Sequence, residues 1–220
     1  MFKTVTQKTT LLATLIGALS LAIPARATIT FDGSGIDTNT FQQTANNPCV
    51  IGDPSCNEPS GMTYTSHTGP GDYTLTSPVY TATSPFVTFS GNLIPTSFII
   101  GIDSNIATGA GQQTLIFFET YSCDSAGLNC VLDANNSYET DTLLPNNNNG
   151  NGYSDATLSG FTLTNGVKYQ FKAGVTNASD GMEEFFIIQN NSPSVPEPVT
   201  SALVGSGLIA LFFVRRRVRG

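Results

Sequence analysis

Short runs of β-branched and aromatic residues, separated by turn-forming residues, fill the middle of this 220-residue chain. Residues 97–102 and 114–121 are the strongest runs, and their nearly continuous apolar content predicts strands that are buried on both faces. A last strand is expected at 183–189. Helical periodicity is hard to find between residues 28 and 195, so we expect an all-β domain over 28–189.

The clearest local pattern lies at 160–174. Residues 161–163 and 167–171 flank Asn165-Gly166, a pair that supplies the positive φ angles of a type I′ turn, so a hairpin is predicted here. Weaker strands are expected at 28–31, 73–75, 79–83 and 86–89. About eight short strands with turns between them predict a β-sandwich, of which the jelly roll is one arrangement.

The N-terminal segment has the pattern of a secretory signal. Lys3 and Lys8 precede an apolar run at 11–23, and the small-residue pattern Ala25-Arg26-Ala27 follows it. Residues 1–27 are therefore expected to be a signal peptide that is removed on export. A permanent anchor is the alternative, but a 13-residue run is short for a membrane crossing.

A second apolar run, at 199–214, holds 16 residues without a charge. As a helix it would cover roughly 24 Å, close to the lower limit for a membrane span. It is followed by Arg215, Arg216 and Arg217, which favour a cytoplasmic end. A buried C-terminal helix of the β domain is the alternative. The run is preceded by Val195, Pro196, Glu197 and Pro198.

The Pro-Glu-Pro triplet, the short span and the arginine cluster, in this order over residues 195–220, resemble the PEP-CTERM sorting signal. The resemblance covers only these 26 residues. It implies a partner, an exosortase-type processing enzyme that removes the tail near the triplet, and a Gram-negative host that exports the protein. We therefore expect a membrane-anchored precursor, a linker at 190–194, and a final location at the cell surface or in the extracellular matrix.

The charge is concentrated in separate parts of the chain. The sequence has nine basic and sixteen acidic residues, but only Lys168 and Lys172 lie between residues 28 and 195, against fifteen acids. A domain this acidic should repel nucleic acid. The same charge suits cations and solubility.

Four cysteines form two pairs with Cys-x6-Cys spacing, Cys49 with Cys56 and Cys123 with Cys130. Export implies an oxidising compartment, so disulfides are expected. Three connectivities are possible, and we favour the two local ones. The Cys-x2-Cys spacing of common zinc sites is absent.

An alternation of oxygen-bearing residues suggests a calcium site. Asp133, Asn135, Glu139 and Asp141 share a face if the segment is a strand, and in a loop they could converge on Ca²⁺. The calcium-loop template fails, because Leu144 stands where its bidentate Glu belongs. A solvated strand face explains the same pattern. Weaker acidic sets are Asp103 with Asn105, and Asp180 with Glu183 and Glu184.

Catalytic patterns are scarce. His67 is the sole histidine, it lies in a loop-like segment, and paired cysteines supply no nucleophile. We expect a non-enzymatic exported protein without a required cofactor. One alternative is a calcium-assisted module that binds extracellular polysaccharide, for which several tyrosines offer aromatic platforms. The other is a secreted hydrolase that uses paired carboxylates.

Overall fold

The computed structural model describes residues 28–33, 41–106, 111–145, 152–179 and 181–189. The predicted signal peptide (1–27) and the tail (195–220), with its sorting residues and its apolar span, lie outside these ranges. They stay predictions. Within the described ranges, no helix has the length and apolarity that a membrane crossing requires.

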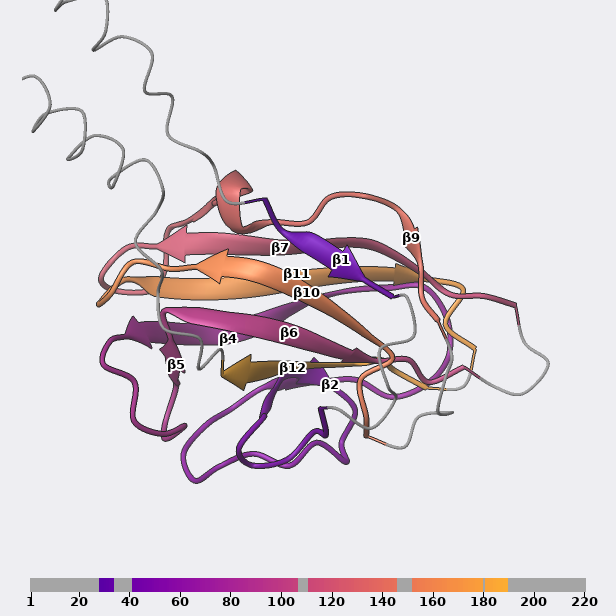
Figure 1. Ribbon diagram of the computed structural model, residues 1–220, viewed down its shortest axis with the longest axis horizontal. Coiled ribbons are helices and arrows are strands. Elements are labelled where there is room, and N and C mark those ends of the chain that lie inside the picture. The colour runs from indigo at the N-terminus through magenta and orange to yellow at the C-terminus, as the bar shows by residue number, and fades with distance from the viewer. Residues whose placement is uncertain (1–27, 34–40, 107–110, 146–151, 180, 190–220) are drawn as a thin grey trace, which may run out of the picture. The chain divides into compact units, whose positions relative to one another are not determined.

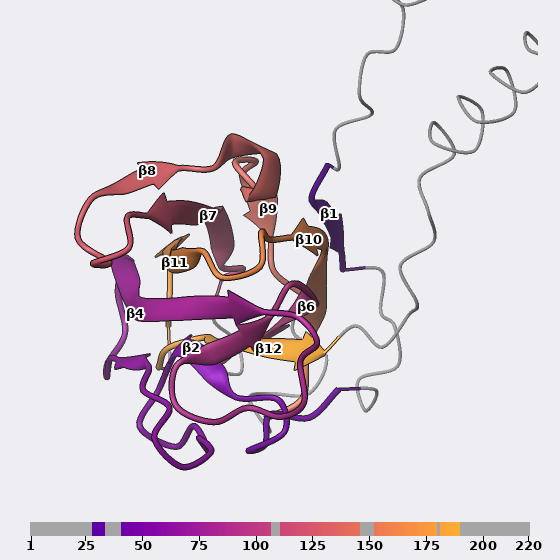
Figure 2. The same cartoon turned by 90° about the vertical axis from the view of Figure 1, so that its left-hand side faces the viewer.

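Twelve described strands form two sheets that pack on one another, which confirms the expected all-β sandwich (Figures 1 and 2). Sheet 1 has the order β1 (Thr30–Asp32), β10 (Ala156–Thr162), β6 (Ser97–Asp103), β12 (Glu184–Gln189), β2 (Cys49–Gly52) and β3 (Thr65–Ser66). Sheet 2 has the order β5 (Leu93–Pro95), β4 (Tyr73–Thr83), β11 (Lys168–Thr176), β7 (Thr114–Cys123) and β8 (Cys130–Leu132), and β9 (Thr142–Leu143) also pairs with β7. The pairs β2–β3 and β4–β5 are parallel, and the other pairs are antiparallel.

A cluster of aromatic rings joins the two sheets. Phe118 of β7 is fully buried, and its ring centre lies 5.8 Å from that of Phe161 in β10 and 5.6 Å from that of Phe185 in β12. Phe171 of β11 lies 5.7 Å from the same ring. Each such ring removes a large apolar area from water and prefers offset or edge-to-face contacts, so the cluster fixes how the sheets face each other.

The strongest apolar runs form strands at the predicted positions, as β6, β7 and β12. Burial on both faces is found for most of β6 but not for β7, because Phe117 and Glu119 are only half-buried on its outer face. The two short strands expected at 73–75 and 79–83 are one strand, β4. Pro78, which cannot donate to a neighbouring strand, lies at an irregularity of the β4–β11 pairing.

The predicted hairpin at 160–174 is wrong. β10 pairs with β1 and β6 in sheet 1, whereas β11 pairs with β4 and β7 in sheet 2. Of the two turn residues, only Gly166 has a positive φ, of 78°, and a type I′ turn requires a positive φ at Asn165 as well. The turn, closed by a hydrogen bond from Val167 N to Thr164 O, therefore carries the chain from one sheet to the other.

The strand expected at 86–89 is also wrong, because this segment is a loop. Two phenylalanines three positions apart would face opposite sides of a strand. In the loop the Phe86 and Phe89 rings meet edge to face, with centres 4.8 Å apart, and both pack against the main core.

Replacement of Phe118 by alanine is expected to lower the free energy of unfolding by about 3–5 kcal/mol, because it empties the centre of the aromatic cluster. Urea unfolding of the full chain measures this change. Val131→Ala is the control, because Val131 is 68 % exposed, and it should change the free energy by less than about 0.5 kcal/mol. Similar losses in the two variants would contradict a cluster that joins the sheets.

Candidate functional site

Sheet 1 buries both of its faces at the β6–β12 pair. Phe185 and Ile187 of β12 face the core between the sheets, while Phe186 and Ile188 belong to a second, smaller apolar cluster on the outer face. The Phe186 ring lies over Gly101 of β6, where a Cβ atom would come within 2.5 Å of it. The outer face therefore needs a cover of its own.

The cover is the segment that contains the first disulfide. Cys49 and Cys56 are bonded and buried in the second cluster, and the Tyr64 hydroxyl donates a hydrogen bond to Asp53 O at 2.9 Å. Both disulfides predicted from the spacing are confirmed, since Cys123 and Cys130 are also bonded. The first disulfide holds its loop, with Asp53 and Ser55, against the outer face of β12.

The carboxyl groups of Asp103 and Glu184 are neighbours at one end of the covered outer face of β6 and β12. Glu184 of β12 is paired in register with Asp103 of β6, so their side chains emerge on the same face. The Ser55 hydroxyl oxygen lies 2.5 Å from Asp53 Oδ1 and 3.2 Å from Glu184 Oε1. Because a hydroxyl has one proton, Ser55 satisfies only one of these carboxyls at a time.

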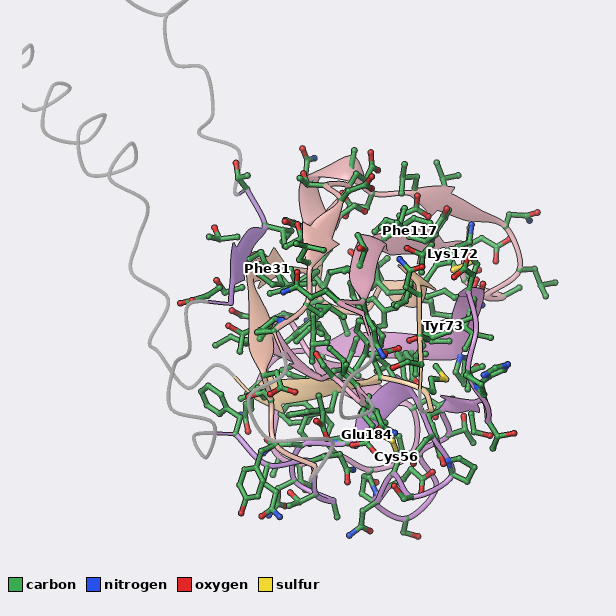
Figure 3. All side chains as sticks on the ribbon, turned by 90° about the vertical axis from the view of Figure 1, so that its right-hand side faces the viewer. Phe31, Cys56, Tyr73, Phe117, Lys172 and Glu184 are labelled. Atoms are coloured by element: carbon green, nitrogen blue, oxygen red, sulfur yellow. A yellow bond between two sulfur atoms is a disulfide. The ribbon has the colours of Figure 1, made fainter. Side chains whose placement is uncertain are left out.

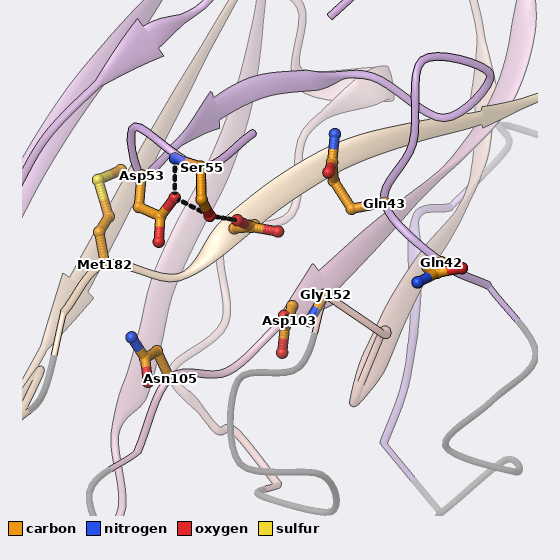
Figure 4. Close-up of a pocket in the computed structure, with 9 residues that line it drawn as sticks. Gln42, Gln43, Asp53, Ser55, Asp103, Asn105, Gly152 and Met182 are labelled. Carbon is orange, nitrogen blue, oxygen red and sulfur yellow. Dashed lines mark hydrogen bonds between the residues drawn. The ribbon is translucent and has the colours of Figure 1, made fainter. Parts of the chain in front are cut away.

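The acids border a cavity of about 380 Å³, shown in Figure 4. In this close-up Asp53 and Ser55 lie on one side, and Asp103 and Asn105 on the other. The remaining residues that line it are Gln42, Gln43, Gly152, Met182 and Glu184. We call this cavity the acidic pocket. Its walls offer mainly oxygen atoms and amides.

Asp103 is only 2 % exposed. Its Oδ2 accepts a hydrogen bond from Gly152 N at 2.6 Å, but its Oδ1 is buried without a partner. Burial, followed by the charges of Glu184 and Asp155, raises the pKa of Asp103 to about 8. The fold therefore holds a carboxyl group where ionisation is unfavourable unless a positive charge arrives.

Glu184 has a similar environment and is 6 % exposed. Its Oε2 is buried without a hydrogen-bond partner. Burial, followed by the charge of Asp53, raises the pKa of Glu184 to about 7. The two lysines of the described residues, Lys168 and Lys172, both lie on β11 of sheet 2, so neither stands among the residues that line the pocket.

Glu183, the neighbour of Glu184, is also fully buried but lines no part of the pocket. Its Oε2 accepts a hydrogen bond from the Tyr73 hydroxyl, at the start of β4 in sheet 2. Burial raises the pKa of Glu183 to about 7, although this hydrogen bond opposes the shift. This pair is a polar link between the sheets. Figure 3 shows Tyr73 well apart from Glu184, which lies beside Cys56.

The calcium residues suggested by the alternating pattern lie elsewhere and are not on a strand. Asp133 caps the short 3₁₀ helix η1 (Ala134–Asn136), where its Oδ1 accepts from Asn135 N and its Oδ2 from Asn136 Nδ2. Glu139 and Asp141 are exposed in the following segment. The carboxylates of Asp133, Glu139 and Asp141 do not gather within 4.8 Å of one another. A metal at these residues stays a prediction.

One other set of residues suggests metal chemistry that it cannot support, and His67 does not belong to it. Glu184 and the sulfurs of Cys49 and Cys56 lie within 4.8 Å of one another, but a disulfide has no thiolate to offer a metal. His67 is half-buried, and its ring centre lies 5.9 Å from that of Tyr73.

The acidic pocket was not predicted as a unit. The sequence suggests two separate acidic sets, Asp103 with Asn105, and Asp180 with Glu183 and Glu184, and nothing in it points to Asp53. Asp180 lies outside the described residues. The sequence feature that indicates the pocket is the position of these acids directly beside apolar runs that form strands. A carboxyl group at the end of a buried strand lies close to low-dielectric surroundings, where its charge is unfavourable unless it is paired.

The free energy of unfolding, measured in a chelator, is expected to fall as the pH rises from about 5 to about 7. Asp103, Glu183 and Glu184 ionise near pH 4 when unfolded but at about 7 to 8 when folded. The stabilisation by bound protons is complete below about pH 4 and is lost as the pH rises through the folded pKa values. Between the unfolded and the folded pKa, each group lowers the free energy of unfolding by at most about 1.4 kcal/mol per pH unit.

Asp103→Asn removes one of these groups and should make the fall with pH shallower, whereas Glu139→Gln, at an exposed position, should not. A free energy of unfolding that increases between pH 5 and pH 7 would contradict burial of the three carboxyls.

Loss of the Cys49–Cys56 disulfide is expected to destabilise the chain more than loss of Cys123–Cys130. Both bonds close loops with a sequence separation of seven, so the chain-entropy effect is the same, about 2–3 kcal/mol each. Only the first is buried and covers β12. Urea unfolding of the two double-alanine variants compares them, and equal losses would show that the covering layer adds nothing.

No protein-family model, curated protein or solved structure matches this chain. The interpretation of the acidic pocket therefore depends on its own geometry and chemistry.

Proposed function

We propose that the chain is an exported, non-enzymatic protein of the cell surface or extracellular matrix, sorted and processed through its C-terminal segment. The observation that carries this proposal is the order of the tail, where Pro196-Glu197-Pro198 precedes the uncharged run at 199–214 and then the arginines. On this proposal the tail anchors the protein until an exosortase-type enzyme removes it.

The β domain supports export in a separate way. All four cysteines are bonded in two disulfides, which form and persist in oxidising compartments outside the cytoplasm. The bonded cysteines also supply no thiolate for covalent catalysis. A structural or binding role thus agrees better with the described side chains than a cysteine-dependent reaction does.

We further infer that the sandwich is of the jelly-roll type. The central strands of sheet 1 have the order β10-β6-β12-β2, and those of sheet 2 the order β4-β11-β7-β8. Along the chain, β2, β4, β6 and β7 alternate between the sheets, and so do β10, β11 and β12. Strands that alternate in this manner form the two interlocked Greek keys of a jelly roll.

A second candidate function is binding of extracellular polysaccharide. It is favoured by the polar lining of the acidic pocket, since amide and carboxylate groups are the partners that sugar hydroxyls use. The tyrosines favour it less: Tyr73 is buried, and the hydroxyls of Tyr64 and Tyr121 are bonded within the domain. Binding of the chain to a glycan array, with and without a chelator, tests this function. The absence of binding under both conditions would reject it.

The sorting proposal is tested by expressing the full chain and a chain that lacks residues 195–220 in an exosortase-bearing Gram-negative host. The full chain is expected first in the membrane fraction and then, shortened, at the surface or in the medium. The truncated chain should bypass the membrane-bound stage.

A third form, in which Arg215, Arg216 and Arg217 are replaced by glutamine, keeps the apolar run but removes its charged end. It should impair anchoring or processing. The same distribution for all three forms would reject the sorting proposal.

A further inference from the structure

We propose that the acidic pocket is a calcium site, in which one Ca²⁺ ion is held by Asp103, Glu184 and Asp53. This goes beyond sorting, because it concerns the β domain alone. It also differs from the alternating set at 133–141 suggested by the sequence.

The first observation is the state of the carboxylate oxygens. Asp103 Oδ1 and Glu184 Oε2 are buried, lack a hydrogen-bond partner, and belong to side chains that border the same cavity. A buried acceptor without a partner costs about 1–3 kcal/mol, and more if it is charged. Proteins therefore pair such groups or use them to bind metals.

The second observation is the absence of a cationic side chain from the residues that line the pocket. The one ion pair of the described residues joins Lys172 to Glu119 in sheet 2. Asp155, which is 2 % exposed, adds a further nearby acid and accepts a hydrogen bond from Ser104 N through Oδ2. A divalent cation is the charge that this arrangement lacks.

The donor set selects the metal. The pocket offers carboxylate and amide oxygens but neither histidine nor thiolate, and this set suits hard cations rather than zinc or copper. Ca²⁺ accepts six to eight oxygens in irregular geometry, whereas Mg²⁺ demands a near-ideal octahedron. Donors from two strands and one loop, around a cavity that also accommodates water, fit Ca²⁺ better.

Direct binding by all three carboxylates requires a movement of the protein. Two oxygens on one calcium ion are at most about 5 Å apart, and the carboxylates of Asp53, Asp103 and Glu184 do not form a group of three within 4.8 Å. Asp103 and Glu184 are fixed in paired strands, whereas Asp53 is half-buried on the disulfide loop. Asp53 and Glu184 already share the Ser55 hydroxyl as a neighbour. On the proposal the loop carries Asp53 toward Asp103, directly or through a water, and the ion joins the loop to β6 and β12.

Calorimetric titration of the chelator-treated full chain with CaCl₂ tests the site. The unchanged chain should bind one Ca²⁺ in the pocket and unfold at a higher temperature with Ca²⁺ than without it. Asp103→Asn and Glu184→Gln should each weaken binding by about tenfold or more, because affinity depends on the number of charged ligands. The isosteric controls Asp133→Asn and Glu139→Gln should change it less than about twofold. In chelator, Asp103→Asn should be at least as stable as the unchanged chain, which separates lost binding from misfolding.

A terbium measurement places the ion independently of these variants. The chain has no tryptophan, so tyrosines sensitise the emission of Tb³⁺, which occupies calcium sites. Tyr64 contacts the Asp53 backbone, whereas Tyr121 contacts Glu119 on sheet 2, near Glu139. At saturating Tb³⁺, Tyr64→Phe should lower the emission several-fold and Tyr121→Phe should not, and Ca²⁺ should quench the emission by displacement.

Several results would overturn the proposal: no Ca²⁺ binding by the unchanged chain, equal binding by all variants, or losses confined to the Asp133 and Glu139 variants. Emission that depends on Tyr121 rather than on Tyr64 would place the ion on sheet 2 and reject the pocket. Because none of these measurements involves residues 195–220, failure of the calcium site and failure of the sorting proposal are distinguishable.

Discussion

The burial of β12 on both faces is the constraint on which the rest of the structure depends. A strand of a two-layer sandwich ordinarily buries one face and exposes the other. Here Phe185 and Phe186 point in opposite directions and both are fully buried. Sheet 2 covers the first, and the loop closed by Cys49 and Cys56 covers the second. Without that loop, the outer face would expose an apolar patch, and the acidic pocket would have no wall on that side.

The same alternation gives two adjacent glutamates different surroundings. Glu183 is directed to the side of the main core and meets the Tyr73 hydroxyl from the other sheet. Glu184 is directed to the covered outer face and meets Asp103 across the strand pair. Both carboxyls have raised pKa values because burial disfavours their charge. Each carboxyl accepts a hydrogen bond from a hydroxyl on one oxygen, Tyr73 for Glu183 and Ser55 for Glu184, and keeps a second buried oxygen without a partner. The difference is their position, because only Glu184 lines the acidic pocket, where a cation could reach that oxygen.

Local pattern predicted the elements, but not how they combine. The apolar runs at 97–102, 114–121 and 183–189 became strands, and the two cysteine pairs closed as their spacing suggested. The hairpin failed because Asn165-Gly166 marks a turn but does not say whether the chain returns to the same sheet or crosses to the other. The pocket depends on the pairing of Glu184 with Asp103, 81 positions apart, and on a loop from a third region. No short-range period encodes that register.

The covering loop and the proposed ion both link stability to location. A ligand that binds only the folded state stabilises it in proportion to the logarithm of its concentration relative to Kd. Where Ca²⁺ is scarce, the buried carboxylates of the pocket repel one another and weaken the fold. Where Ca²⁺ is abundant, the proposed ion would let the same groups join β6 and β12 to the loop. The Cys49–Cys56 bond follows the same logic, because it persists only in oxidising surroundings. An exported chain would thus acquire its disulfide and its ion outside the cytoplasm, and both act on the single layer that covers β12.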